Sequence, residues 1–134
     1  MENETYLHCP YFEKKKRENQ QTAEAISRKV KSLYLNQVGE IYPPINIVTL
    51  SRQHIMEALE LDETSDFSEP FDRVSEVLSL LMEEKFIYTV DGEPERTVWR
   101  RYSSISRRTN AFDFFLSEAY TEALEKIKLH PFVF

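Results

Sequence analysis

The residues best suited to chemistry in this chain are arginines that alternate with aromatic residues in its last third. The cluster comprises Arg96, Trp99, Arg100, Arg101, Tyr102, Arg107 and Arg108. Guanidinium groups beside aromatic rings can bind phosphates and stack on bases. The same residue types are over-represented as anchors in protein interfaces. In a third interpretation, Trp99 lies in the core and the arginines pair with the chain's own carboxylates. The sequence leaves all three interpretations open.

Two further basic features could meet phosphates. Lys14, Lys15, Lys16 and Arg17 form an unbroken run near the N-terminus. Such a run can bind nucleic acid, or it can be the solvated start of a helix. Arg73 is the one cation on the exposed face of the helix expected after residue 70. We count these five residues with the arginine cluster as candidate nucleic-acid contacts.

An acidic block separates the two basic regions. Residues 45–95 hold 3 basic and 13 acidic residues, a net charge of −10, in a chain whose total is −6. Asp72, Glu76 and Glu83 fall on the exposed face of the helix that would enter a DNA groove. Duplex DNA carries one charge per ~1.7 Å of its axis and would repel them. We therefore treat these three carboxylates as candidate contacts for a protein partner.

No set of residues predicts an enzyme, a metal site or a cofactor. His8, His54 and His130 are far apart, and Cys9 has no identifiable base to activate it. The carboxylates of residues 57–72 lack the alternating ligands and central glycine of a calcium loop. Two glycines in the whole chain argue against glycine-rich phosphate loops. We expect a non-enzymatic protein without metal or cofactor.

Hydrophobic spacing predicts the elements that would position these groups. A long helix is expected from residue 18 to 38, a short strand over 45–50, and a helix over 52–61 with Ser51 as its N-cap. A further helix should begin near Pro70, with Phe71, Val74, Val77, Leu78 and Leu81 on one face. Strands over 86–90 and 97–102 flank a turn at 91–95. The strand over 45–50 is expected to join this hairpin as its third strand.

The predicted order is helix, strand, helix, helix, strand, strand. The chain here resembles the winged-helix superfamily, in particular through Leu78, Leu81, Lys85, Phe86 and Ile87 leading into the wing. The resemblance covers residues 18–102 and implies an α+β winged-helix (helix-turn-helix) fold. It also implies that the third helix and the wing are the elements placed to contact DNA.

The remaining residues would flank this domain. We expect an N-terminal arm over residues 1–17, the winged-helix domain over 18–104, and an added C-terminal helix with an apolar tail over 105–134. The last helix is predicted to start at an Asn110 cap and to bury Phe112, Phe115, Leu116 and Tyr120. An exposed apolar face of this kind implies a homodimer or docking to another subunit, unless the helix packs on its own chain. Candidate interface residues are Trp99, Phe115, Tyr120, Phe132 and Phe134.

The composition is consistent with one domain that has a real core, since 41% of residues are hydrophobic and 30% are charged. No apolar run reaches the ~18 residues of a membrane span, so no membrane association is predicted. A single cysteine favours a reducing compartment, either cytoplasmic or nuclear.

Two functions remain. The first is an acidic winged-helix adaptor or regulatory subunit that docks protein partners within a DNA-associated complex. The alternative is a homodimeric transcription regulator that binds DNA through its arginine-rich wing. Charge favours the first, and the common use of the fold favours the second.

Overall fold

The computed structural model describes residues 10–37, 45–62, 66–88 and 97–129. The elements, in chain order, are α2 (Pro10–Gln37), β1 (Ile47–Ser51), α3 (Arg52–Ala58), α4 (Ser68–Glu76), α5 (Leu78–Glu83), β2 (Lys85–Tyr88), β3 (Thr97–Arg100), β4 (Tyr102–Arg108), β5 (Ala111–Leu116) and α6 (Glu118–Leu129). The α+β class is confirmed. From α2 to β3 the chain follows the winged-helix order, with α4 and α5 together in the place of the third helix.

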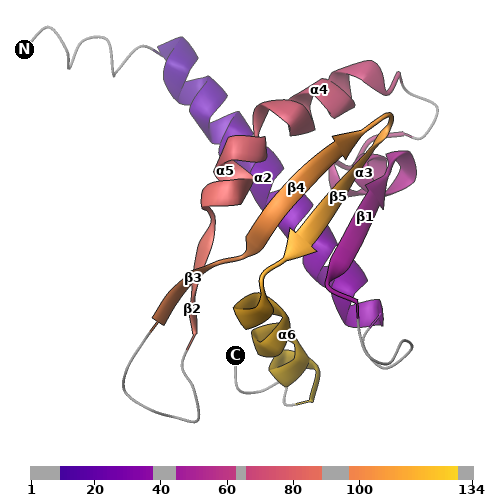
Figure 1. Ribbon diagram of the computed structural model, residues 1–134. Helices are drawn as coiled ribbons and strands as arrows, with labels where there is room; N and C mark the ends of the chain where they lie inside the picture. The colour runs from indigo at the N-terminus through magenta and orange to yellow at the C-terminus, as the bar shows by residue number, and fades with distance from the viewer. Residues whose placement is uncertain (1–9, 38–44, 63–65, 89–96, 130–134) are drawn as a thin grey trace, which may run out of the picture.

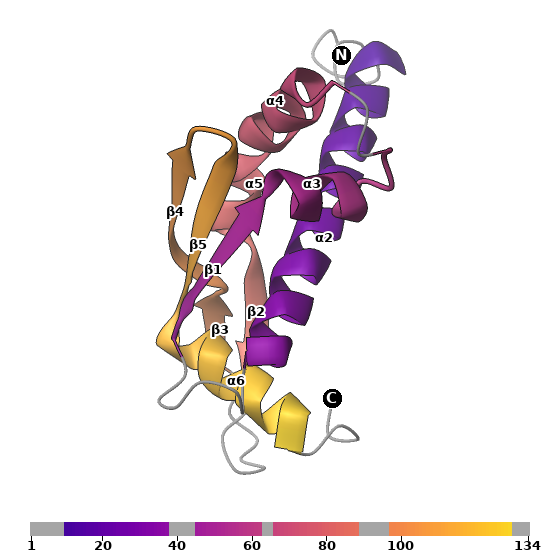
Figure 2. The same ribbon diagram turned by 90° about the vertical axis from the view of Figure 1, so that its right-hand side faces the viewer.

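The strands form two separate antiparallel sheets, one of three strands in the order β1-β5-β4 and one of two strands, β2-β3. Figure 2 shows the three-stranded sheet as one layer, with α2 running along the opposite side of the molecule. The helices α3 and α4 lie near one end of this sheet, and α6 lies near the other end (Figure 1). The hairpin β2-β3 extends from the end of α5, as a wing does.

The core lies between the three-stranded sheet and the helices. Alternation along β5 buries Phe112, Phe114 and Leu116 against the helices, and their intervening neighbours lie on the outer face. Phe71 of α4 stacks on Phe112 with ring centroids 4.7 Å apart. From α2, Ile26, Val30 and Tyr34 are buried, as the helical spacing predicts.

The sequence-based boundaries need correction at two helices. The long helix begins at Pro10, so the basic run of residues 14–17 lies within α2 rather than in an arm. The helix expected after Pro70 is divided at Val77, whose φ and ψ of −101° and 7° leave the helical region. Ser51 is the N-cap of α3, as predicted: its hydroxyl accepts the backbone N–H of His54, and the His54 side chain accepts the N–H of Ser51.

The prediction of a helix starting at Asn110 was wrong. Asn110 has a φ of 64° and occupies the tight turn between β4 and β5, a conformation that asparagine tolerates better than most residues. Residues 111–116 then form the central strand of the larger sheet, which takes β1 as its neighbour. The strand β1 therefore does not join the hairpin as its third strand, and that prediction was also wrong. The last helix starts only at Glu118.

Candidate functional site

A cleft of about 820 Å³ lies between α2, the end of α3 and the helix α4. Five carboxylates and three basic residues line it, so its charged lining has a net charge of −2. The acidic residues are Glu18, Glu60, Glu69, Asp72 and Glu76, and the basic residues are Lys15, Arg28 and Arg73. The cleft is therefore polar and acidic on balance.

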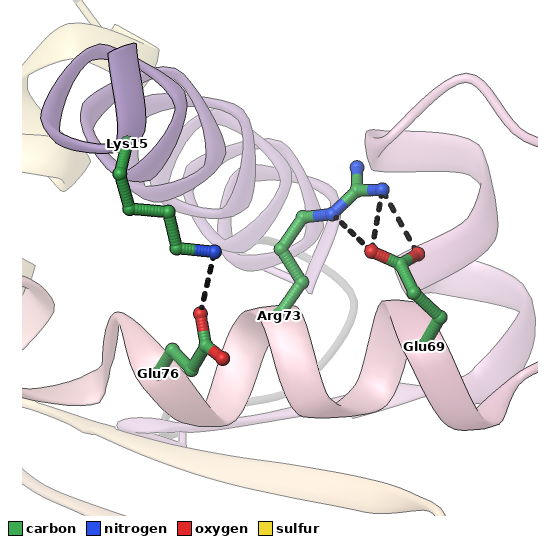
Figure 3. Close-up of polar contacts among 4 residues, drawn as sticks. All are labelled: Lys15, Glu69, Arg73 and Glu76. Atoms are coloured by element: carbon green, nitrogen blue, oxygen red, sulfur yellow. Dashed lines mark hydrogen bonds and ion pairs between the residues drawn. The ribbon is translucent and has the colours of Figure 1, made fainter. Parts of the chain in front are cut away.

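Two of the three cations in the cleft are held by neighbouring carboxylates (Figure 3). The Nη2 atom of Arg73 lies 2.8 and 2.9 Å from the two carboxylate oxygens of Glu69, one turn earlier on α4. Lys15 Nζ of α2 lies 3.1 Å from the Glu76 carboxylate across the cleft. These pairs neutralise Glu69 and Glu76 in part and occupy Arg73, the residue expected to meet DNA from this helix.

Asp72 remains as an exposed carboxylate on the cleft side of α4. It forms no ion pair with any other residue that the structure describes. Glu83 is also exposed, at the end of α5. The predicted acidic face therefore exists, and Asp72 is its cleft-lining carboxylate that forms no ion pair within the described residues.

On α2 the predicted basic run divides into paired and unpaired residues. Lys14 lies 4.0 Å from Glu18, one turn further along the helix, and Lys15 pairs with Glu76. Lys16 and Arg17 are exposed, and neither forms an ion pair within the described part of the chain.

Most of the predicted arginine cluster contacts the chain itself. Arg108 pairs with Asp113 at 2.8 Å, and the Arg107 guanidinium lies 4.8 Å from the centroid of the Phe71 ring. Arg101 belongs to a polar cluster with Tyr120 and Glu84. Arg100 is exposed, and Arg96 lies outside the described residues. The cluster is therefore not one continuous cationic surface.

The polar cluster joins α2, the end of α5, the β3–β4 junction and α6. The Ser27 hydroxyl donates to the Glu84 carboxylate, and it lies 2.9 Å from the Tyr102 hydroxyl. Arg101 donates to the Tyr120 hydroxyl at 3.0 Å, and its Nε lies 3.7 Å from Glu84. No local pattern in the sequence signals this cluster, because Ser27 is 57 residues from Glu84 and 75 from Tyr102.

Burial dominates the electrostatics of this cluster. It raises the pKa of the Glu84 carboxyl above its ordinary 4.5, although Ser27 and Arg101 both favour the ionised form. Burial also raises the pKa of the Tyr102 and Tyr120 hydroxyls above 10, so both remain protonated at neutral pH. A small pocket of about 220 Å³ opens beside the cluster. We assign the cluster a structural role, since each of its polar groups is used to hold the wing and α6 against α2.

The aromatic interface candidates lie in different environments. Trp99 is 47% exposed on the wing, and Phe115 lies half-buried on the outer face of the larger sheet. Tyr120 is only 3% exposed and belongs to the core of its own chain. Phe132 and Phe134 lie outside the described residues, as do His8, Cys9 and His130.

The helix α6 packs on its own chain through Tyr120, Ala123 and Leu124, which are each 3% exposed or less. This is the intramolecular alternative to dimerisation. The homodimer through this helix therefore stays a prediction without support from these residues.

Within the described residues, no group of three or more His, Cys, Asp or Glu side chains could hold a metal ion. In the same residues, no helix is long and apolar enough to cross a membrane. His54 has an identified structural use, since it completes the cap of α3.

No protein-family model matches this chain, and no curated protein matches it. Among solved structures, the chain is similar to the crystal structure of the MSBI1.176 WH1 domain, a replication protein isolated from a multiple sclerosis patient. The two chains are 16% identical, the match covers 78% of this chain and 85% of that chain, and the TM-score is 0.43. A similarity of this degree carries no argument about what this chain does.

Proposed function

We propose that this domain is a non-enzymatic adaptor that docks a basic surface of a partner protein in the cleft between α2, α3 and α4. The observation that carries the proposal is the acidic lining of the cleft, with Glu69, Asp72 and Glu76 along the α4 wall. A partner that presents lysine or arginine would meet a surface of opposite charge.

The same geometry disfavours the duplex as the occupant of this surface. In DNA-binding winged helices the third helix enters the major groove. Here Arg73, the cation of α4, is already held by both oxygens of Glu69. Bringing Asp72 and Glu76 towards phosphates would add repulsion that no described cation of α4 offsets.

The internal ion pairs of the cleft do not block a partner. The Lys15 and Glu76 side chains are 43% and 52% exposed, so their pair is well solvated. Exposed pairs of this kind contribute only about 0–1 kcal/mol. A partner's arginine could displace Lys15 at low cost and form a bidentate pair with Glu76.

Nucleic-acid binding is the second candidate. It is supported by Lys16, Arg17 and Arg100, which are exposed and form no ion pair within the described residues. These three lie on two elements, α2 and β3. Because they are separated, these three residues form a less continuous phosphate-binding surface than a single arginine cluster would.

The test compares two single charge reversals, Asp72→Lys in the cleft and Glu118→Lys at the start of α6. Both residues are exposed, and the change in net charge is the same. The full chain and both variants would be used to capture proteins from a lysate of the source organism, with quantitative mass spectrometry. We expect a partner that Asp72→Lys loses and Glu118→Lys retains. A partner that both variants retain equally would rule out the cleft as the docking site.

A further inference from the structure

The wing carries an exposed apolar pair on the face opposite its packing contacts. In the β2-β3 register, Ile87 lies directly opposite Val98, and Phe86 lies directly opposite Trp99. Alternation places the two pairs on opposite faces of the hairpin. Phe86 lies against Tyr120 of α6 with ring centroids 5.1 Å apart, so its face is the packed one. Ile87 and Val98 are 55% and 57% exposed on the other face.

Two cations form the next cross-strand pair beside this apolar pair, on the same face. Lys85 lies directly opposite Arg100, and both share the orientation of Ile87 and Val98 along their strands. Both side chains are exposed, and neither forms an ion pair with another residue of the described ranges. The outer wing face, defined as Lys85, Ile87, Val98 and Arg100, therefore combines two aliphatic groups with two positive charges.

Nothing in the described part of the fold covers this face. The strand expected beside the hairpin, β1, belongs instead to the other sheet, and the hairpin has two strands only among the described residues. A hairpin gains stability when its face is covered by further packing. The exposed pair is thus an adjacent apolar surface that a partner could cover.

We propose that the outer wing face docks an acidic segment of a partner protein that also carries aliphatic side chains. Its carboxylates would pair with Lys85 and Arg100, and its aliphatic groups would cover Ile87 and Val98. This surface is separate from the acidic cleft and opposite to it in charge, so the inference does not depend on the function proposed for the cleft.

Charge decides between the possible occupants. A second copy of this chain, placed face to face about a two-fold axis, would bring four cations together and is disfavoured. Nucleic acid would satisfy Lys85 and Arg100, but its phosphates and sugars would leave Ile87 and Val98 poorly covered, and neither side chain has the aromatic ring that stacks on bases. An acidic segment with aliphatic residues satisfies both halves of the face.

The experiment selects binders to the full chain from a displayed library of random peptides and measures the affinity of the enriched peptides by fluorescence anisotropy. Ile87→Thr with Val98→Thr replaces one apolar branch of each side chain with a hydroxyl but keeps the β-branching that suits a strand. Lys85→Glu with Arg100→Glu reverses the charges. Lys16→Glu with Arg17→Glu is the matched control, since it makes the same change in net charge at exposed sites on α2. Circular dichroism would confirm that each variant is folded.

We expect enriched peptides to combine carboxylates with aliphatic residues. Each wing variant should weaken their binding by about tenfold or more, and the α2 control by no more than about twofold. Failure to enrich such peptides, or equal affinity for all variants, would overturn the proposal. Binding and competition measurements with a labelled duplex and a labelled single strand test nucleic acid as the alternative occupant. If it displaces the peptides and binds the threonine variant as tightly as the unaltered chain, the face belongs to nucleic acid and the proposal is wrong.

Discussion

Truncating Phe114 to alanine should destabilise the domain strongly, whereas the same change at its neighbour Phe115 should have a much smaller effect. Phe114 is 0% exposed in the central strand β5. It lies opposite Val48 and Ile105 on the two flanking strands, and its ring is 5.3 Å from that of Tyr102. Phe115 points to the outer face of the sheet and is only half-buried.

The size of the effect follows from burial. Replacing a fully buried phenylalanine by alanine costs about 3–5 kcal/mol, because apolar contacts are lost and a cavity remains. At Phe115 the loss should be roughly 1 kcal/mol, typical of a partly exposed apolar side chain. The free energy of unfolding would be measured by urea titration with far-UV circular dichroism, and equal m-values would show that the comparison is sound.

The pair of variants distinguishes a strand from a helix at these residues. In a helix with Phe112, Phe115 and Leu116 facing inwards, Phe114 would lie on the opposite side, so the two losses would be reversed. Equal or reversed losses would refute the assignment of β5 and the packing of the larger sheet built on it.

Three other substitutions test local features. Asn110 has a positive φ of 64°. Asn110→Val should therefore destabilise the domain by about 1–2 kcal/mol relative to Asn110→Gly, and thermal unfolding of both variants would check this. Ser51→Ala should cost about 1 kcal/mol through loss of the α3 cap, and an unchanged urea midpoint would contradict the capping role. Glu84→Gln should change how stability depends on pH. Because the pKa of Glu84 is raised, the stabilisation from its protonated form is complete below about pH 4.5 and is lost as the pH rises through the raised pKa. The variant should therefore gain stability relative to the unaltered chain over that pH range, and parallel curves would contradict the assignment.

Local signals in the sequence were sufficient for much of the fold. The buried stripe of α2, the serine cap of α3 and the pairing of the two β-rich segments each depend on residues close together in the sequence. These features together predicted the α+β class and the order of elements as far as β3. They could not locate the break at Val77, which has no proline or glycine to mark it.

The larger sheet could not be predicted because its signal is ambiguous. Residues 111–116 are almost all apolar, so their pattern fits a strand of period two and a helix of period 3.6 equally well. The choice was decided by contacts with β1, which lies far earlier in the chain. Once β5 takes β1 as a neighbour, the hairpin β2-β3 is left with two strands and an exposed outer face.

The candidate sites were predicted only in part. The acidic face of α4 follows from helical spacing, and Asp72 is where the sequence placed it. Whether a cation is free or paired depends on distant partners, such as Lys15 with Glu76 or Arg101 with Tyr120. The composition therefore gives the number of arginines, but it could not show that several of them form contacts within the chain.

The most direct test of the adaptor proposal is a titration of the full chain against a labelled random-sequence duplex and a single strand, at low salt and again at ~0.2 M. The proposal predicts little binding of either nucleic acid at both salt concentrations, because the acidic cleft faces outwards and most arginines are engaged internally. Steeply salt-dependent binding that disappears when Lys16, Arg17 and Arg100 are replaced by alanine would contradict it and establish nucleic acid as the partner.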